Sequence, residues 1–276
     1  MHRLSGRRRM KMIFDTHAHY NDPSFSEDRD ELLKALGPAG VGRVVNIGCC
    51  VESSYDCVDL ARRYDFIYAT VGVHPDDCAD LSDEDLITLK DLARKNLYRE
   101  GGSGKVVAIG EIGYDLYRDD HVDEQVQQHW FEAQLEMANE LDLPVVIHSR
   151  KAALRTLETL RALKTGDRAG VMHCYGYSVE MARDFLNMGY YIGLGGVVTF
   201  KNARVAKEVA AYVPEDRLII ETDCPYISPV PLRGTRNDSR NLHYVVQALA
   251  EIRGVTEEEI ERTTWENACR MYGIKD

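Results

Sequence analysis

Two hydrophobic patterns alternate along the chain. Short apolar runs rich in Val and Ile, typical of buried strands, are separated by longer stretches in which apolar residues recur every three or four positions, as in amphipathic helices. The first strand begins at Ile13, and seven more are predicted at 43–48, 66–73, 105–110, 144–148, 170–173, 190–193 and 217–223. Helices are predicted between them at 26–36, 53–64, 82–97, 122–141, 152–163, 178–188 and 202–212, and two more follow the last strand.

Eight strands alternating with helices predict an α/β fold. Over about 260 residues this alternation matches a single (β/α)₈ TIM barrel with an additional helix at the C-terminal end, although the strand count alone also fits an open doubly wound sheet. No internal repeat or long linker divides the chain, so we assign residues 12–276 to one barrel domain. Residues 1–11 are rich in arginine and lack an apolar segment, and we interpret them as a disordered leader or an expression remnant.

The overall composition excludes fewer classes of function than the hydrophobic pattern excludes folds. A net charge of −11 gives no general attraction to nucleic acid or acidic lipid, although a bound metal ion reverses the local field for a phosphate-bearing substrate. No apolar run approaches the roughly 20 residues of a membrane span, so we expect no membrane association. The seven cysteines form no Cys-x-x-Cys pair, which indicates reduced thiols and a cytoplasmic protein.

Side chains of the kind that bind metal ions stand at the ends of five predicted strands. His17 and His19 are two residues apart, so on extended backbone they point to the same side. Alone this pair is a weak signal, but the carboxyl ends of barrel strands are where enzymes of this fold carry their active sites. The coincidence of six such residues at these ends predicts a metal site formed by His17, His19, Glu111, His148, His173 and Asp223.

Four histidines and two carboxylates exceed the ligands that one tetrahedral ion needs. We therefore predict two divalent metal ions that share one carboxylate, with Glu111 as the bridge. The mixed donor set suits Mg²⁺, Zn²⁺, Mn²⁺ or Fe²⁺ without choosing between them. Such a pair provides a metal-activated hydroxide near neutral pH, and Asp223 is the candidate general base, so Asp223 and Glu111 are the predicted catalytic residues.

Five segments together resemble a known family. In chain order they read Phe-Asp-Thr-His-Ala-His (14–19), Gly-Glu-Ile-Gly-Tyr-Asp (110–115), Leu-Pro-Val-Val-Ile-His-Ser-Arg (143–150), His-Cys-Tyr-Gly (173–176) and Glu-Thr-Asp-Cys-Pro-Tyr (221–226). They are similar to the motifs of the TatD family of metal-dependent deoxyribonucleases, which belongs to the amidohydrolase-like barrels. The resemblance implies that one ion is bound by His17, His19, Glu111 and Asp223, and the other by Glu111, His148 and His173.

Four further residues match the family by motif and are expected to contact substrate. His74 stands in Gly-Val-His-Pro, Arg150 lies two residues after His148, and Arg233 and Arg236 belong to the loop after the last strand. A forked guanidinium is suited to phosphate oxygens. The competing readings are a hydrogen-bonded rim histidine for His74 and a surface arginine in the first helical turn for Arg150.

The chain departs from the family pattern at two places. The usual Glu-Pro after Arg-Asn is Asp238-Ser239 here, and the usual Phe-Ser-Gly after the sixth-strand histidine is Cys174-Tyr175-Gly176. Cys174 and Cys224 directly follow predicted ligands, so continued strand geometry would turn them away from the metals. We therefore expect neither thiol to act at the site.

Three classes of function fit these residues to different degrees. The resemblance implies a metal-dependent hydrolase that cleaves phosphodiester bonds in DNA, a 3′–5′ exodeoxyribonuclease acting on DNA ends or short single-stranded nucleic acid, with no obligate protein partner. The same ligands also serve an ester or amide hydrolase, such as an aminoacyl-tRNA deacylase, and a phosphate-binding arginine cluster would favour the phosphodiester. A binding module without turnover fits less well, because the water-handling Asp223 is present.

Overall fold

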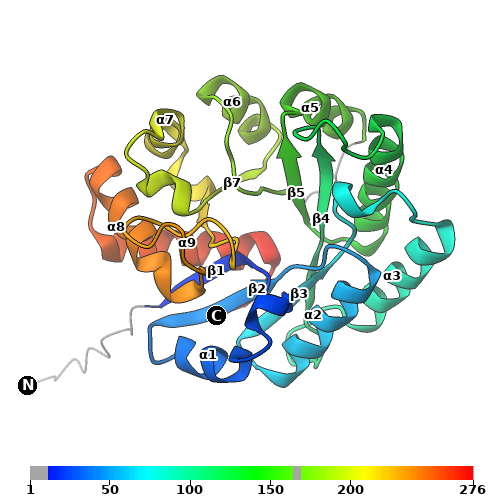
Figure 1. The fold of residues 1–276 in the computed structure, drawn as a ribbon, viewed down its shortest axis with the longest axis horizontal. Helices are drawn as coiled ribbons and strands as arrows, with labels where there is room; N and C mark the ends of the chain where they lie inside the picture. Colours follow the sequence, from blue (N-terminus) through cyan, green and yellow to red (C-terminus); the bar gives the residue numbers. More distant parts are fainter. Residues whose placement is uncertain (1–11, 164–168, 276) are drawn as a thin grey trace, which may run out of the picture.

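The computed structural model describes residues 12–163 and 169–275, so the predicted leader at 1–11 lies outside the described residues. Eight strands alternate with helices along the chain, as the hydrophobic pattern predicts (Figure 1). The strands are β1 (Ile13–Ala18), β2 (Val41–Asn46), β3 (Ile67–Val71), β4 (Val106–Asp115), β5 (Val145–Arg150), β6 (Gly170–Met172), β7 (Tyr191–Leu194) and β8 (Leu218–Ile220).

All neighbouring strands are parallel and follow one another in chain order from β1 to β8. The ring is closed by contacts between β1 and the segment after β8, where Asp223 N donates to His17 O and His19 N donates to Cys224 O. Thr16 Oγ1 adds a hydrogen bond to Ile220 O. This is the TIM barrel that the alternation predicts, and it brings the carboxyl ends of all eight strands to one face.

Helices surround the barrel (Figure 1). Two of the helices begin with capping boxes, because Ser82 pairs with Asp85 and Thr256 pairs with Glu259 in reciprocal side chain–backbone bonds. The helices are α1 (Arg29–Leu36), α2 (Val51–Arg63), α3 (Asp83–Lys95), α4 (Glu124–Leu141), α5 (Ala153–Ala162), α6 (Val179–Asn187), α7 (Arg204–Tyr212), α8 (Leu242–Arg253) and α9 (Glu257–Tyr272).

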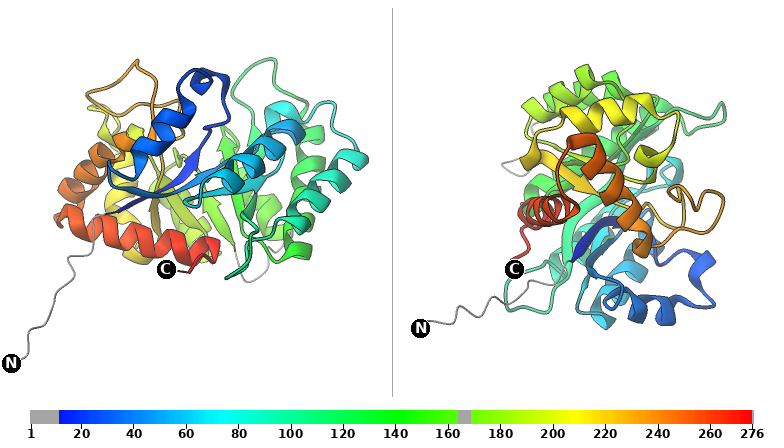
Figure 2. Two further views of the ribbon diagram at one scale, coloured as in Figure 1. Left: turned by 90° about the horizontal axis from the view of Figure 1, so that it is seen from below. Right: turned by 90° about the vertical axis from the view of Figure 1, so that its left-hand side faces the viewer.

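The additional C-terminal helix, α9, closes the amino end of the barrel. Its Met271 and Tyr272 pack with the buried side chains that point into the barrel, among them Phe14 of β1 and Tyr191 of β7. Figure 2 shows α9 on the side of the molecule opposite to the loops that follow β1 and β8. The helix therefore leaves only the carboxyl end of the barrel open for a site.

Strand β4 is longer than predicted. A glycine was expected to end it at Gly110, but the strand continues to Asp115 and pairs with β5 through Gly113 and His148. Gly113 has a φ of +144°, and a Cβ built there would lie 2.0 Å from His148 O, so the close approach of the two strands requires glycine. Glu111 consequently lies within a fully buried strand rather than in a loop.

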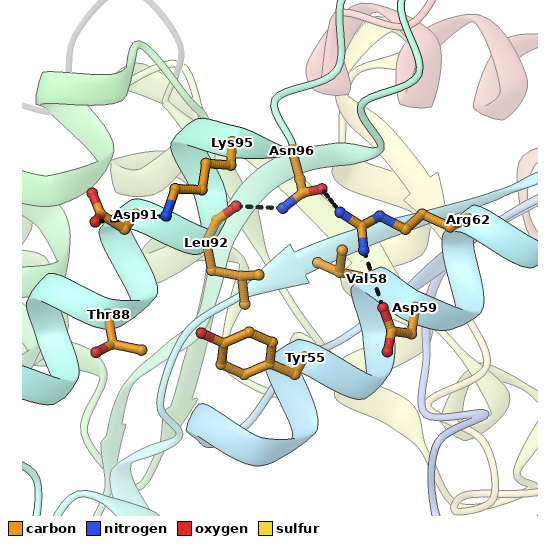
Figure 3. A pocket seen from close by; sticks show the side chains of 9 residues that line it. All are labelled: Tyr55, Val58, Asp59, Arg62, Thr88, Asp91, Leu92, Lys95 and Asn96. Atoms are coloured by element: carbon orange, nitrogen blue, oxygen red, sulfur yellow. Dashed lines mark hydrogen bonds and ion pairs between the residues drawn. The ribbon is translucent and has the colours of Figure 1, made fainter.

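A surface groove of about 400 Å³ lies on the outer wall, between α2 and α3. Figure 3 shows that its charged side chains already bind one another: Arg62 contacts Asp59 and Asn96, and Lys95 lies beside Asp91. The groove is remote from the carboxyl end of the strands and is not our candidate site. In the described part of the chain, no helix is both long enough and apolar enough to cross a membrane.

Candidate metal centre

Four of the predicted ligands converge on one point above β1. The Nε2 atoms of His17 and His19 are 3.1 Å apart, and Asp223 Oδ1 lies 3.6 Å and 3.3 Å from them. Glu111 Oε2 lies 3.4 Å from His17 Nε2 and 3.9 Å from His19 Nε2. Ligands bound tetrahedrally at the usual 2.0–2.2 Å are separated by about 3.4 Å. The spacing of these four groups therefore fits a single divalent ion.

A buried hydrogen-bond network holds this first group. Asp15 is fully buried between the histidines of β1 and the segment after β8, and its carboxylate accepts bonds from Thr222 N, Thr222 Oγ1 and Ser239 Oγ. Asp223 itself has a left-handed backbone, with φ of 56°. The network fixes the residue before Asp223 against β1, which aims the Asp223 carboxylate at the two histidines.

Glu111 turns its other oxygen toward a second group. Oε1 lies 2.6 Å from His148 Nδ1, 3.6 Å from His173 Nε2 and 3.7 Å from His74 Nε2. One carboxylate thus faces two sets of imidazoles with its two oxygens. His173 lies between the sets, because its ring stacks on His17 at 3.4 Å between centroids and its Nε2 is also 3.9 Å from Asp223 Oδ1.

His74 approaches the second group as a hydrogen-bond donor. The backbone N–H of Asp76 donates to His74 Nδ1, so the ring proton must be on Nε2, the nitrogen that faces Glu111. Burial and the neighbouring His148 lower the pKa of His74 to about 3, which keeps the ring neutral. A protonated Nε2 cannot bind a metal ion, so this tautomer fits the expected substrate contact better than a ligand role.

Two buried carboxylates, neither of them predicted from the sequence, orient the histidines of the second group. Asp115 Oδ2 lies 3.0 Å from His148 Nε2, and Glu221 Oε1 lies 3.1 Å from His173 Nδ1. Metal-binding histidines are commonly held in this way by a carboxylate on the other ring nitrogen. Strand alternation was the available signal, since Asp115 is four residues after Glu111 and Glu221 is two residues before Asp223.

The electrostatics of the site are those of carboxylates surrounded by imidazoles. Burial opposes ionisation of Glu111, but His173, His17 and His74 hold its pKa well below the usual value. Despite burial, bonds to Asp115 and Glu111 raise the pKa of His148 to about 9. Burial likewise opposes the charge on His173, but Glu221 and Glu111 raise its pKa to about 10. Without metal, these two histidines carry protons at neutral pH.

In the described part of the chain, neither of the two predicted carboxylate ligands is paired with lysine or arginine. Among the described residues, every ion pair of Glu111 and Asp223 is with a histidine. Burial opposes ionisation of Asp223, but its bond to His19 and the nearby His173 and His17 lower its pKa. Histidines that can lose their proton and ionised carboxylates, grouped together in a buried position, suit a divalent cation. The residues present therefore fit the metal ions expected from the sequence.

Two thiols lie at the site, and the prediction for one of them was wrong. Cys174 Sγ groups with ligand atoms of His173 and Asp223 within 4.8 Å of one another, because its left-handed backbone, with φ of 44°, breaks the alternation that was expected to turn it away. Cys49 Sγ lies 3.8 Å from both His19 Nδ1 and Glu111 Oε2, and nothing in the sequence around it signalled this position. Cys224 is fully buried in the core.

The three predicted substrate arginines have different surroundings. Arg150 lies 3.9 Å above the ring of Tyr117, and Arg233 lies 4.3 Å above the ring of Phe200. Within 12–163 and 169–275, neither forms an ion pair with a carboxylate. Arg236 instead binds Asp28 with both terminal nitrogens, at 2.8 Å and 2.5 Å. This placement argues against a substrate contact for Arg236 and assigns it to holding its loop.

Comparison with known proteins identifies the family of this chain. The family described as TatD related DNase matches residues 14–273. A Bacillus subtilis relative named uncharacterized metal-dependent hydrolase YabD is 40% identical over 263 residues, covering 95% of this chain and 100% of its own length. A Cronobacter sakazakii relative named 3′-5′ ssDNA/RNA exonuclease TatD is 33% identical over 265 residues, covering 94% of this chain and 97% of its own.

A solved structure gives the same picture. The crystal structure of YjjV, a TatD homologue from Escherichia coli, superposes with a TM-score of 0.89 at 31% identity, covering 96% of this chain and 99% of that one. The chain therefore belongs to the TatD family of metal-dependent hydrolases.

Proposed function

We propose that this hydrolase removes nucleotides from the ends of single-stranded DNA, working from 3′ to 5′ at a site with two divalent ions. The observation that carries the proposal is the position of Glu111, whose two carboxylate oxygens face two separate groups of imidazoles. Sharing of one carboxylate is how two-metal sites hold their ions about 3.5–4 Å apart. The direction and the substrate follow the name of the Cronobacter sakazakii relative.

The proposed ligand sets follow from the geometry. His17, His19 and Asp223 would hold one ion together with Glu111 Oε2, and Glu111 Oε1, His148 and His173 would hold the other. When bound, the ions acidify water and offset the negative charge of a phosphate.

The protein's own groups have separate tasks in this proposal. Asp223 Oδ1 faces the histidines, and among the described residues no hydrogen bond is made by Oδ2, which leaves that oxygen to accept the proton of the attacking water. His74 donates through Nε2–H to a phosphate oxygen. Arg150, with no carboxylate partner in the described structure, offers two further donors to the charge that develops there.

The test uses the purified protein stripped of metal with a chelator and then supplied with Mg²⁺, Mn²⁺ or Zn²⁺. A 5′-labelled single-stranded oligonucleotide should give a ladder that shortens from the 3′ end only after metal is restored. The Asp223→Asn variant should lose this activity, whereas Asp216→Asn, a change in the exposed turn before β8, should not. Cleavage that is independent of metal or of Asp223 would contradict the mechanism.

A second candidate is hydrolysis of a carboxyl ester or amide, as in an aminoacyl-tRNA deacylase. The ion pair of Arg236 with Asp28 favours it to a degree, because it removes one of the three arginines expected to bind phosphate. Release of amino acid from aminoacyl-tRNA, in an assay where the same preparation leaves DNA intact, would establish the second candidate over the first.

A further inference from the structure

Two exposed tyrosines flank the metal centre, one beside each group of ligands. We infer that Tyr226 and Tyr117 are stacking surfaces for unpaired bases, so that the site selects single-stranded over double-stranded nucleic acid. This inference rests on the proposed nuclease function and adds to it the feature of the substrate that is recognised. Neither ring has a role in the metal centre described above.

Tyr226 stands at the edge of the first group. Its side chain is 55% exposed although its ring centroid is only 6.3 Å from that of His19, in an edge-on arrangement. The hydroxyl donates to Asp22 Oδ2 at 3.1 Å, and its backbone N–H donates to Asp223 O. The ring is therefore held in one position next to a metal ligand while a large part of its surface remains open to solvent.

Tyr117 stands at the edge of the second group. Its side chain is 50% exposed, and its backbone N–H donates to Asp115 Oδ1, the carboxylate whose other oxygen lies beside His148. Arg150 and Lys151 lie 3.9 Å and 5.0 Å from the ring centroid. Aromatic surface and cationic groups are thus placed together, the combination by which single-stranded nucleic acid is bound.

Because the protein is acidic, we expect base stacking on the tyrosines to contribute more to binding than the nearby cationic side chains do. With a net charge of −11, the chain cannot attract a polyanion through its general field. Stacking of a base on an aromatic side chain contributes about 1–3 kcal/mol, tolerates any base and requires that the base be unpaired. Bases stacked beside the two ligand groups would bring the phosphates that join them to the metal centre.

The chain contains a matched control for an exposed tyrosine. Tyr212 at the end of α7 is 39% exposed and has Arg183 at 5.8 Å above its ring. The turn at Glu215–Arg217 leads directly from there into the amino end of β8, so Tyr212 lies on the side of the barrel opposite to the metal centre. Like Tyr117, Tyr212 is an exposed tyrosine beside a cationic side chain, but it does not lie at the metal centre.

The experiment measures two quantities for Tyr117→Ala, Tyr226→Ala, Tyr226→Phe and Tyr212→Ala. One is binding of a fluorescent single-stranded oligonucleotide to metal-free protein, by anisotropy, and the other is KM and kcat with metal restored. We expect each alanine change at Tyr117 or Tyr226 to weaken binding and raise KM by roughly 5- to 150-fold, the equivalent of one stacked base. Tyr226→Phe keeps the aromatic ring and should lose less binding than Tyr226→Ala, and Tyr212→Ala should stay within about twofold of the unchanged protein.

An oligonucleotide with abasic residues at its 3′ end separates stacking from other effects. The losses from removing the base and from removing the ring should not add, because both remove the same contact. Additive losses, an equal loss in Tyr226→Phe, or unchanged binding in both alanine variants would overturn the inference. Absence of cleavage in the unchanged protein would overturn the proposed nuclease function alone, since the anisotropy measurement does not need cleavage.

Discussion

The two ends of the barrel are built from the same eight strands and differ in almost every other respect. At the amino end, Phe14, Tyr68 and Tyr191 point into an apolar interior that Met271 and Tyr272 of α9 cover. At the carboxyl end, imidazoles and carboxylates take the place of apolar side chains. A strand can thus contribute to the core at one end and to the chemistry at the other.

The backbone shows the same division. Within the described residues, five non-glycine residues have left-handed backbone, and four of them, Lys151, Cys174, Asp223 and Ile227, follow strands at the carboxyl end. Such conformations cost of order 1–3 kcal/mol each and persist where the surroundings enforce them. We infer that the apolar packing at the amino end stabilises the fold enough to offset the cost of the strained backbone and buried polar side chains at the carboxyl end. The following predictions test whether the two ends are separable.

The largest effect is expected at the open end, from Glu111→Gln. The change removes the charge that faces both groups of ligands, so we expect hydrolysis to fall by about 10⁴-fold, the scale on which loss of a central catalytic group acts. Activity and bound metal per protein should both be measured, with Glu136→Gln on the exposed side of α4 as the control. Full metal content with full activity would show that Glu111 is not the bridge.

The next effect is expected at the closed end, from Tyr272→Ala. The side chain is fully buried against the barrel interior, so its removal should cost about 3–5 kcal/mol of unfolding free energy. Tyr272→Phe, which loses only the hydrogen bond to Thr16 O at 2.8 Å, should cost about 1 kcal/mol. Denaturant unfolding measures both. A large fall in kcat of the still-folded protein would show that the two ends are coupled.

A smaller effect is expected from Glu221→Gln, because Glu221 acts through His173. Loss of an orienting carboxylate of this kind costs about 10–100-fold in metal affinity or activity. Metal titration should detect the change without any assay of hydrolysis, and Glu251→Gln on the surface of α8 serves as the control. A variant that binds metal as the unchanged protein does would assign Glu221 to folding alone.

The last prediction leaves the chain unchanged and concerns the dependence of metal affinity on pH. At pH 7 the metal-free protein holds protons on His148, with a pKa of about 9, and on His173, with a pKa of about 10, and a metal ion must displace them. Affinity should therefore rise with pH from 6 to 8, by about tenfold per unit for each proton displaced. Calorimetry in buffers of different ionisation enthalpy counts those protons, and pH-independent affinity would contradict the assignment.

The sequence predicts the closed end and the open end unequally well. Hydrophobic periodicity depends only on burial, so the alternation of strands and helices, the barrel and the extra helix are all confirmed. The six predicted ligands lie together because the carboxyl ends of parallel strands meet at one face. Family membership is confirmed by the match over residues 14–273.

The hydrophobic pattern of the sequence could not predict the local backbone conformation at the site. The left-handed backbone of Cys174 reverses the direction that strand alternation assigns to its side chain. Gly110 was expected to end β4, but the strand continues through Gly113, where the close approach of His148 O requires glycine. Arg236 has a partner, Asp28, that is 208 residues away in the chain and could not be paired with it from spacing. Glu221 and Asp115, by contrast, were within reach of the alternation rule.

The packing of α9 on β1 has a consequence for the order of events during synthesis. Strand β8 ends at Ile220, so the ring of strands is complete about 50 residues before Met271 and Tyr272 are made, which at roughly 5–20 residues per second is about 2.5–10 s. During that interval the chain on the ribosome contains every strand of the barrel and every predicted metal ligand, but lacks the helix whose side chains cover the apolar interior. We expect the nascent barrel to expose apolar surface, and to be prone to aggregation, until α9 is added.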